Sequence, residues 1–404
     1  MPKIIIFTSL TLWSMGNGSG GPAFTQTVKK YIDKGWDVFL VSDEPRNRDY
    51  PHLDSAHNIL LQPSPFKKYG GIRKFGLVFR WLDHLAAIRS FCKQGKVLLK
   101  QGEKATILYA YEVFGVKACA KMAKRFSLPL VTRFQGTILS QYENNWRNHI
   151  KRYPHYHALS QSADLVIMTD DGTLGDKVLR ELGNTSPTLF LRNGLELLEK
   201  DVSEMKGNFE RNAFRSSLGV SADEIMFLTV SRLTGWKKVE RVIDGFSAFC
   251  KHNPCGKLII VGEGDTRASL EHRATELGIS DRVKFTGSIA HDDVYNYMMA
   301  CDVFLSLYDL SNVGNPLLEA MTLGKCIVTL DVGDTRSLIR NRENGILLTI
   351  ETLPSLGDVM IELAEDDTLR TRLGEAASEY AHTHFQTWQE RMETEVHAVS
   401  RLLS

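Results

Sequence analysis

The sequence predicts two Rossmann-like α/β domains, each built on an open parallel sheet. At 404 residues the chain is too long for one hydrophobic core and suits two domains of ordinary size. Short apolar runs alternate with longer helical patterns along the chain, which is typical of parallel strands joined by crossover helices. Residues 196–215, acidic and then basic, interrupt this alternation and predict a connection. We therefore expect domains at 1–200 and 201–375.

The apolar runs give the order of the strands in each domain. Because the carboxyl ends of parallel strands gather at one edge of a sheet, a crevice shared by two such sheets is the expected active site. Helix formers dominate 369–403, which predicts a helical tail. The predicted strands are 4–8, 37–42, 105–109, 129–134, 165–169 and 188–191 in the first domain, and 225–231, 257–262, 283–286, 303–307, 326–330 and 345–349 in the second.

Composition restricts the class of protein and its partners. Hydrophobic residues make up 43% and charged residues 24%, which allows substantial cores in a soluble chain. The net charge of +1 provides no field for nucleic acid, so no nucleic-acid partner is expected. The six cysteines are scattered without paired CxxC elements, which favours reduced thiols in a cytoplasmic protein. Neither a signal peptide nor a run of about 20 apolar residues is found, so we expect a chain that is neither exported nor integral to a membrane.

The first candidate site is the glycine-rich segment 15–22, between the first strand and the helix that follows it. Its candidate residues are Gly18, Gly20 and Gly21. Glycines let backbone amides approach an anion, and the start of a helix adds a favourable dipole. The spacing departs from the dinucleotide motif GxGxxG. A flexible loop without a ligand is the alternative.

The second candidate site is the segment 231–238, which ends the first strand of the second domain. Arg232 and Lys237 lie five positions apart and can converge on one diphosphate. They would stabilise negative charge on a departing diphosphate. A solvated basic loop is the alternative, although the position at a strand's carboxyl end argues against it.

The third candidate site is the segment 308–320. Pro316 fits the first turn of a helix, so the amides of Val313, Gly314 and Asn315 would point towards a phosphate or sugar. Glu319 lies about one turn into that helix and can accept hydrogen bonds from a ribose diol. The alternative is an acidic residue that only complements the helix dipole.

Taken together, these segments resemble retaining GT-B glycosyltransferases, the large group 1 family that includes sucrose synthases and bacterial mannosyl- and N-acetylglucosaminyltransferases. The resemblance covers nearly the whole chain and is stronger in its second half. The segments that carry it are 231–237, 261–264, 285–287, 312–325 and 344–345, with weaker similarity at 20–21, 34–38, 192–194 and 385–388.

The resemblance implies a GT-B fold with a central cleft, an acceptor-binding first domain and a donor-binding second domain, with residues 376–404 crossing back onto the first. It implies a nucleoside diphosphate sugar as co-substrate, no other cofactor, and retention of anomeric configuration. Arg232 and Lys237 would bind the donor diphosphate and Glu319 the ribose. The remaining donor-site residues implied by the resemblance are Gly287 and Ser288, in a loop to residue 289 beside the base, and Ser311, Asn312, Val313, Gly314 and Asn315 around the transferred sugar.

Two positions depart from the family pattern. Ser311 stands where the family usually has a glutamate, eight residues before Glu319, so the sugar hydroxyls must be bound by neighbouring polar groups. Gln135 follows the fourth predicted strand where the family usually has a histidine. Since an amide does not shuttle protons, we expect Gln135 to position the sugar or the acceptor.

The acidic pairs beginning at Asp170 and Asp292 fit helix caps and first-turn acids, so no metal site is expected. Residues 66–100 combine basic and aromatic residues, as in helices that lie at an anionic membrane interface. An ordinary domain helix explains the same pattern, and both interpretations stay open.

The expected function is transfer of a hexose-type sugar from a nucleoside diphosphate to a glycan or lipid-linked acceptor. The expected location is the cytoplasm, at the inner face of the membrane if 66–100 binds lipid. A nucleotide-sugar epimerase is the nearest rival enzyme. A non-catalytic subunit that binds sugar nucleotides is a rival of another class, suggested by Ser311 and Gln135.

Overall fold

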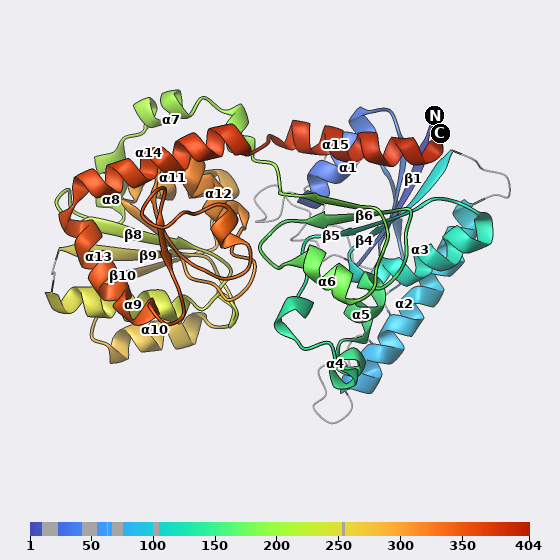
Figure 1. The fold of residues 1–404 in the computed structure, drawn as a ribbon, viewed down its shortest axis with the longest axis horizontal. Helices are drawn as coiled ribbons and strands as arrows, with labels where there is room; N and C mark the ends of the chain where they lie inside the picture. Colours follow the sequence, from blue (N-terminus) through green and yellow to red (C-terminus); the bar gives the residue numbers. More distant parts are fainter. Residues whose placement is uncertain (10–22, 43–54, 63, 67–75, 100–104, 253–254) are drawn as a thin grey trace. The chain divides into compact units, whose positions relative to one another are not determined.

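The computed structural model describes residues 1–9, 23–42, 55–62, 64–66, 76–99, 105–252 and 255–404 (Figure 1). The chain forms two compact units, each with its own parallel sheet. The first unit comprises Met1–Asp170, Leu174–Asn193 and Trp388–Ser404, and the second comprises Asp171–Thr173 and Gly194–Thr387.

The sheet of the first unit has the order β3-β2-β1-β4-β5-β6-β7, with parallel pairing throughout the described strands. The order reverses between β1 and β4, because the chain leads from β1 outward to β3 and then returns to β4. The strands are β1 (Lys3–Thr8), β2 (Asp37–Ser42), β3 (His57–Leu60), β4 (Thr106–Tyr111), β5 (Leu130–Phe134), β6 (Leu165–Thr169) and β7 (Thr188–Leu191).

Helices cover both faces of this sheet. Alternate residues of β1 enter different cores: Ile4 and Ile6 pack into one cluster, Ile5 and Phe7 into the other. None of the helices in the described residues combines the length and apolarity needed to cross a membrane. The helices are α1 (Ala23–Asp33), α2 (Gly76–Leu98), α3 (Val113–Phe126), α4 (Trp146–Lys151), α5 (Tyr153–Leu159), α6 (Gly175–Glu181) and α15 (Trp388–Ser400).

The last long helix, α15, belongs to the first unit although it ends the chain. Its Glu395 is fully buried and pairs with Arg133 of β5 at 2.9 Å. Tyr109 donates its hydroxyl hydrogen to the same carboxylate at 2.7 Å, and Arg391 pairs with it from within α15. The predicted return of the C-terminal helix is therefore confirmed, and an ionic network in the core holds it.

The sheet of the second unit has the order β10-β9-β8-β11-β12-β13, and its described strands are also parallel. Met226 and Leu228 of β8 pack into one core, Ile225 and Phe227 into the other, so this sheet too is covered on both faces. The strands are β8 (Ile225–Val230), β9 (Gly256–Val261), β10 (Val283–Gly287), β11 (Val303–Ser306), β12 (Cys326–Leu330) and β13 (Ile346–Leu348). The helices are α7 (Val202–Asn208), α8 (Arg211–Ser217), α9 (Val239–His252), α10 (Arg267–Glu276), α11 (His291–Ala300), α12 (Asn315–Thr322), α13 (Leu356–Glu365) and α14 (Asp367–His384).

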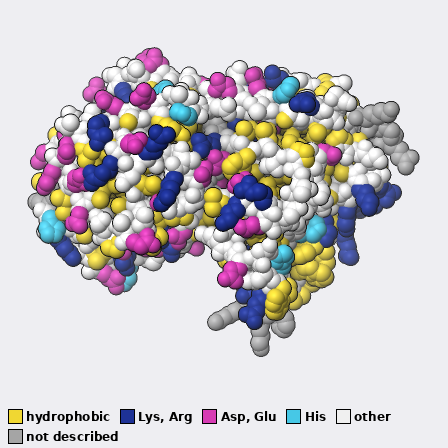
Figure 2. Space-filling model, viewed as in Figure 1, with side chains coloured by type: hydrophobic (Ala, Val, Ile, Leu, Met, Phe, Trp, Pro, Cys, Tyr) yellow, Lys and Arg dark blue, Asp and Glu magenta, His cyan; other side chains and the backbone are white. Residues whose placement is uncertain are grey.

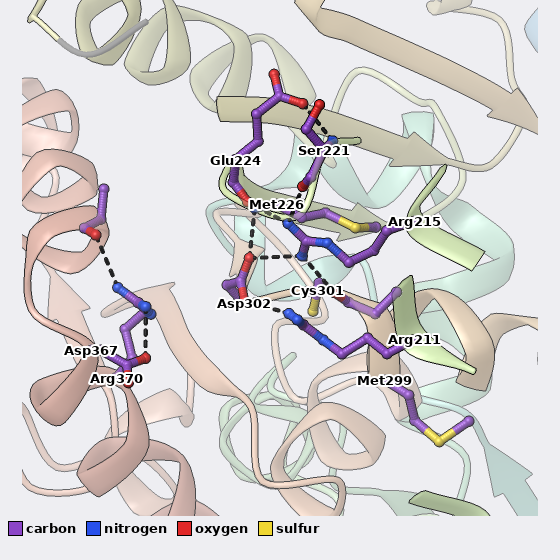
Figure 3. Close-up of polar contacts among 12 residues, drawn as sticks. Arg211, Arg215, Ser221, Glu224, Met226, Met299, Cys301, Asp302, Asp367 and Arg370 are labelled. Carbon is purple, nitrogen blue, oxygen red and sulfur yellow. Dashed lines mark hydrogen bonds and ion pairs between the residues drawn. The ribbon is translucent and has the colours of Figure 1, made fainter. Parts of the chain in front are cut away.

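At the amino ends of β8 and β11, Asp302 forms ion pairs with two arginines of α8 (Figure 3). Arg215 pairs with one carboxylate oxygen at 3.0 Å and Arg211 with the other at 2.5 Å. The amide of Met226 also donates to Asp302, at 2.7 Å. This network ties α8 to the amino ends of β8 and β11, opposite the carboxyl ends where the donor site is predicted.

Three predicted boundaries differ from the structure. Residues 196–215, predicted as the connection between the domains, belong to the second unit and contain the helix α7 and most of α8. The chain passes between the units at 193–194 rather than at 200–201, since Leu195 and Leu197 already lie in the second unit's core. The tail is divided: α14 packs against α12 in the second unit, and only the chain from Trp388 onward joins the first.

The strand β3 was not predicted. Among the described strands it lies at the edge of its sheet and pairs only with β2, and most of its residues are exposed. Its sequence, His-Asn-Ile-Leu, therefore lacks the apolar run by which the buried strands were recognised.

Candidate functional site

The predicted donor site of the second unit lies at the carboxyl ends of β8 and β11. The strand order reverses between these two strands, and open parallel sheets bind ligands at such a reversal. Residues 231–238 follow β8, and residues 307–314 follow β11. The two segments meet, since the amide of Asp309 donates to the carbonyl oxygen of Trp236 at 3.1 Å.

The side chain of Lys237 is enclosed by groups from both segments. Its Nζ lies 4.5 Å from the ring centre of Trp236 and 4.0 Å from that of Tyr308. It donates a hydrogen bond to the carbonyl oxygen of Ser311 at 3.3 Å. Aromatic faces attract the ammonium but replace little of its hydration, so an anionic ligand would bind it strongly.

Arg232 is close enough to Lys237 for each charge to affect the other. Burial lowers the pKa of Lys237 to about 7, the carboxylate of Asp171 opposes this shift, and the charge of Arg232 reinforces it. Burial of part of its side chain also lowers the pKa of Arg232. Two neighbouring cations that raise each other's energy are stabilised together by a multiply charged anion such as a diphosphate.

Two glycines after β9 allow the backbone to pass directly against the segment that carries Arg232. Gly262 has φ of 136°, and a Cβ there would lie 1.8 Å from the carbonyl oxygen of Ser231. A Cβ on Gly264 would lie 2.0 Å from the carbonyl oxygen of Leu233. The motif 261–264 therefore supports the cationic segment through the backbone.

The segment 311–315 leads into α12 as predicted. Gly314 caps the helix and Pro316 lies in its first turn. Ser311 has the left-handed φ of 56°, which is rare for a residue with a side chain. Asn312 is buried, and its Oδ1 has no hydrogen-bond partner among the described residues. A polar atom left in this state is suited to accept a hydrogen bond from a ligand.

One predicted amide of this segment is not available to a ligand. The amide of Val313 donates to the carbonyl oxygen of Asp171 at 3.1 Å. The prediction that the Val313 amide points towards a ligand is therefore wrong. The contact could not be inferred from the start of the helix, because Asp171 lies far from Val313 in the sequence.

Glu319 lies in α12 with only 2% of its surface exposed. Its Oε1 is 2.9 Å from Nε2 of His291, the first residue of α11. Burial by itself lowers the pKa of His291, but the hydrogen bond and the charges of Glu319, Glu196 and Asp292 raise it by more, so its net direction is upward. The predicted ribose ligand is thus a buried carboxylate with an imidazole partner.

The predicted loop beside the base begins at the end of β10. Gly287 has φ of 77°, and its carbonyl oxygen accepts a hydrogen bond from the amide of Gly262 at 3.0 Å. The next residue, Ser288, is exposed. This loop is therefore joined to the glycine turn after β9.

In the first unit, Gln135 follows β5 and its side chain is held by the protein. Its Nε2 donates to the Tyr111 hydroxyl at 2.5 Å, and its backbone amide donates to Oε1 of Glu112 at 2.7 Å. Glu112 has φ of 67° and ψ of 174°, a conformation almost confined to glycine. Gly18, Gly20 and Gly21 lie outside the described residues.

Glu196, His291 and Asp292 bring three potential metal ligands within 4.8 Å of one another. In the described structure His291 instead bonds Glu319, and Asp292 pairs with Lys200 at 3.0 Å. Of these three residues, His291 is the one that contacts Glu319.

Two contributors to the donor site of the second unit were not predicted, His291 and Tyr308, and neither was Glu112, which contacts Gln135 in the first unit. His291 comes from a helix 28 residues before Glu319, and Tyr308 acts through its ring face rather than its hydroxyl, which donates to Val230. The sequence signal for Glu112 is its position directly after a fully buried strand.

The arrangement in the second unit combines two cations, a buried carboxylate and a helix start at one sheet edge. Such a set can bind a phosphorylated ligand that also carries a diol.

Comparison with known proteins agrees with this geometry. Residues 210–380 match the family model for glycosyl transferases group 1. The chain is 25% identical to N-acetyl-alpha-D-glucosaminyl L-malate synthase of Bacillus anthracis over 92% of this chain and 91% of that protein. It is similar in structure to sucrose-phosphate synthase of Thermosynechococcus elongatus, with TM-score 0.77, 20% identity, and coverage of 100% and 99% of the two chains.

A second similar structure is that of Anabaena HepE in complex with UDP and glucose. The TM-score is 0.75 and the identity 20%, over 99% of this chain and 100% of that one. The whole-length likeness shows the fold, and the family match covers most of the second unit. The protein is therefore a glycosyltransferase of the GT-B fold, and its residues 210–380 are similar to glycosyl transferases group 1.

Proposed function

We propose that the protein transfers a hexose-type sugar from a nucleoside diphosphate sugar to a glycan or lipid-linked acceptor. The observation that carries this proposal is the enclosed ammonium of Lys237 beside Arg232, in the same unit as the buried carboxylate of Glu319. Cations complement a diphosphate, and a fixed carboxylate complements a ribose diol. The complexes of HepE with UDP and with UDP-glucose support this choice of ligand.

In this proposal Arg232 and Lys237 bind the diphosphate and stabilise the charge that develops as it departs. Glu319 binds the ribose, and the loop at Gly287 and Ser288 lies beside the base. The segment 311–315 surrounds the transferred sugar, where the unpaired Oδ1 of Asn312 accepts from a sugar hydroxyl. The second unit then binds the donor, and the first binds the acceptor at the carboxyl ends of its strands.

Gln135 has a positioning role in this proposal. Its amide hydrogens are directed by the Tyr111 hydroxyl, which leaves its carbonyl end to orient a hydroxyl group. We also propose that the transferred sugar keeps its anomeric configuration, as in the family that the chain resembles. Proton NMR of the first-formed product tests this, because α and β anomers differ in the coupling of the anomeric hydrogen.

The reaction requires neither a metal nor another cofactor in this proposal. Lys237 and Arg232 supply the positive charge that a divalent cation would otherwise give to the leaving diphosphate. Turnover that is unchanged by a chelator supports this, whereas activity that is lost with chelator and restored by Mg²⁺ or Mn²⁺ contradicts it.

Donor binding and transfer in Arg232→Ala and Glu319→Ala test the main proposal. The loss of a charge-assisted hydrogen bond should weaken donor binding roughly ten- to hundredfold. A thermal-shift screen with UDP-, GDP- and ADP-sugars first identifies the donor. Arg273→Ala, which removes a partly exposed arginine on α10, is the matched control and should bind normally. Normal turnover in both site variants would refute the assigned roles.

The comparisons favour a transferase over the two rivals. Mass spectrometry separates them directly, since an epimerase leaves the mass of the donor unchanged. A non-catalytic subunit would bind the donor but show no turnover against a broad panel of acceptors.

We further propose that the first unit rests on an anionic membrane surface, which would place the protein at the inner face of the membrane. In α2, Leu77 and Trp81 continue the stripe that buries His84 and Ile88, but they are 45% and 49% exposed. The helix therefore carries its apolar stripe beyond the core that it covers. Of the predicted segment 66–100, residues 67–75 and 100 lie outside the described residues.

The short helix α4 of the same unit also exposes apolar residues. It buries none of its residues, and Trp146 and Ile150 are 69% and 63% exposed beside the exposed Arg147 and Lys151. Figure 2 shows hydrophobic side chains where Figure 1 draws α4 and the start of α2, with Lys and Arg side chains at the border. Trp and flanking cations suit the interface of an anionic bilayer.

Co-sedimentation with phosphatidylcholine vesicles, with and without phosphatidylglycerol, tests this contact. Binding should require the anionic lipid and should fall several-fold for each of Arg147→Ala and Lys151→Ala, since a surface cation contributes about 1 kcal/mol. Trp146→Ala with Ile150→Ala should reduce binding further. Ile350→Ala, at an exposed apolar residue of the second unit, is the control. Equal binding by all variants would refute the surface.

A further inference from the structure

His291 joins two helices beside the carboxylate that we assign to the ribose. It is the first residue of α11, whereas Glu319 lies in the second turn of α12. Its Nε2 is 2.9 Å from Oε1 of Glu319, and the side chains are 18% and 3% exposed. Since an ionised carboxylate can only accept, Nε2 must carry the hydrogen and donate it.

A carboxylate buried to this extent needs such a donor. Without a fixed hydrogen bond, an almost fully buried carboxylate either takes up a proton or turns towards water. Either change would remove an acceptor from the ribose diol. Helix α12 fixes the backbone of Glu319, but its side chain has three rotatable bonds, and a contact at the carboxylate is what fixes the oxygens.

The imidazole is itself held in place. The Tyr295 ring packs edge-on against it, with centroids 5.2 Å apart and an angle of 71° between the rings. Lys200 lies 4.8 Å above the Tyr295 ring and pairs with Asp292 at 3.0 Å. The ring position of His291 is thus determined before a ligand arrives.

We propose that His291 is a positioning residue for donor binding: its Nε2–H fixes Oε1 of Glu319, and the remaining lone pairs of the carboxylate are left for the ribose diol. This inference rests on the proposed function, because it assumes that Glu319 binds ribose. It assigns the cluster of Glu196, His291 and Asp292 to carboxylate positioning.

The charges around His291 give this role a dependence on pH. The groups that face it are Glu319 of α12, Glu196 of the turn after β7, and Asp292 and Tyr295 of α11, while Lys200 balances Asp292. The carboxylates raise the pKa of His291, so the imidazolium persists somewhat above the ordinary value of 6.5. Once it deprotonates, the hydrogen bond to Glu319 loses its charge assistance and should weaken.

Calorimetric titration with UDP, GDP and ADP, followed by donor kinetics, tests the inference with three variants. His291→Ala should raise the Kd of the nucleotide and the KM of the donor roughly tenfold or more, with kcat nearly unchanged. His291→Gln places an amide nitrogen at the position of Nε2 and should restore binding to within a few-fold. His272→Ala, at a histidine that is 73% exposed on α10, is the matched control.

The pH profile separates positioning from a merely structural role. Wild-type affinity should decline as pH rises through the raised pKa of His291, and this component should vanish in His291→Gln, because an amide does not titrate. A chelator should leave the wild-type profile unchanged, and a profile that depends on added Zn²⁺ would overturn the assignment.

The remaining outcomes are distinguishable. If wild-type protein binds none of the nucleotides, both the proposed function and this inference are refuted. If wild type binds and His291→Ala binds equally tightly, only the role of His291 is refuted. The unfolding temperature of each variant, compared with that of the wild type, shows whether the variant is folded. If His291→Ala is unstable, His291→Gln still tests the inference.

Discussion

The ammonium of Lys237 is enclosed by two aromatic rings and the carbonyl oxygen of Ser311. This enclosure lowers its pKa to about 7. A lysine in this state is protonated in only part of the molecules near neutral pH. Its value as a phosphate ligand therefore changes with pH, unlike that of an exposed lysine.

Nucleotide affinity should fall as pH rises above about 7, because only protonated Lys237 attracts the diphosphate. A bound diphosphate shifts the midpoint upward, as it stabilises the cation. Lys237→Arg keeps the charge at all accessible pH values and should remove this component, although its different shape lowers affinity. Calorimetry with inorganic diphosphate isolates the effect from His291. An unchanged profile in Lys237→Arg would contradict the prediction.

Gly262→Ala should destabilise the second unit by about 3 kcal/mol or more, because the new Cβ would lie 1.8 Å from a backbone oxygen at a φ of 136°. Chemical denaturation measures this change in the free energy of unfolding. Gly207→Ala in α7 is the control, since a Cβ there meets nothing within 4 Å. It should be neutral or stabilising by roughly 0.5–1 kcal/mol. Equal effects at both positions would disprove the close approach.

Among the elements, α8 and the start of β11 are joined by Asp302 and its two arginines (Figure 3). Arg215 is 1% exposed and also donates to the carbonyl oxygen of Ala300 at 3.0 Å. Such a buried cation is tolerated only while its partners remain. The network lies at the amino ends of the strands, so it supports the unit without contributing to the donor site.

Asp302→Ala should lower the free energy of unfolding by about 3–5 kcal/mol, because it leaves the buried Arg215 without its carboxylate. Asp367→Ala is the control in the same view: that carboxylate pairs with Arg370 at 2.7 Å but is 84% exposed. Its removal should change stability by less than about 1 kcal/mol. Nucleotide affinity should be unchanged in the folded fraction of either variant.

For the whole molecule, the two units have separate cores, and the chain crosses between them more than once. Since α15 completes the first unit, that unit needs both ends of the chain. Its buried Glu395 balances the charges of Arg133 and Arg391. Burial by itself raises the pKa of Glu395, but the charges of Arg133 and Arg391 lower it by more, so the net direction is downward. The stability from this carboxylate is present above its unfolded pKa near 4.5 and is lost as pH falls through its lower folded value.

Calorimetric unfolding should show two transitions, one for each unit, and each should respond to a different change. Glu395→Gln should lower the transition of the first unit, because it leaves two buried arginines without a countercharge. A nucleoside diphosphate at 100 times its Kd should raise the transition of the second unit by a stabilisation of about 2.7 kcal/mol. A single transition that responds equally to both changes would contradict two separable cores.

The sequence alone was sufficient for the elements whose signals are local. Buried strands such as β4 and β8 are continuous apolar runs, and the start of α12 follows from Pro316 and the residues before it. The family match at 210–380 agrees with the predicted identity of the second domain. The edge strand β3 escaped prediction because exposed strands need no apolar run.

Only the tertiary structure decided which distant groups meet. The bond from His291 to Glu319 joins residues 28 positions apart, and the pairing of Glu395 with Arg133 joins residues 262 positions apart. Lys237 and Tyr308, whose ring encloses it, are separated in the chain by the helices α9, α10 and α11 and the strands β9, β10 and β11. Periodicity and residue type determine what a segment forms and which face it buries. The packing of crossover helices on the sheets determines which charges become neighbours, and with them the pKa of Lys237 and the fixed carboxylate of Glu319.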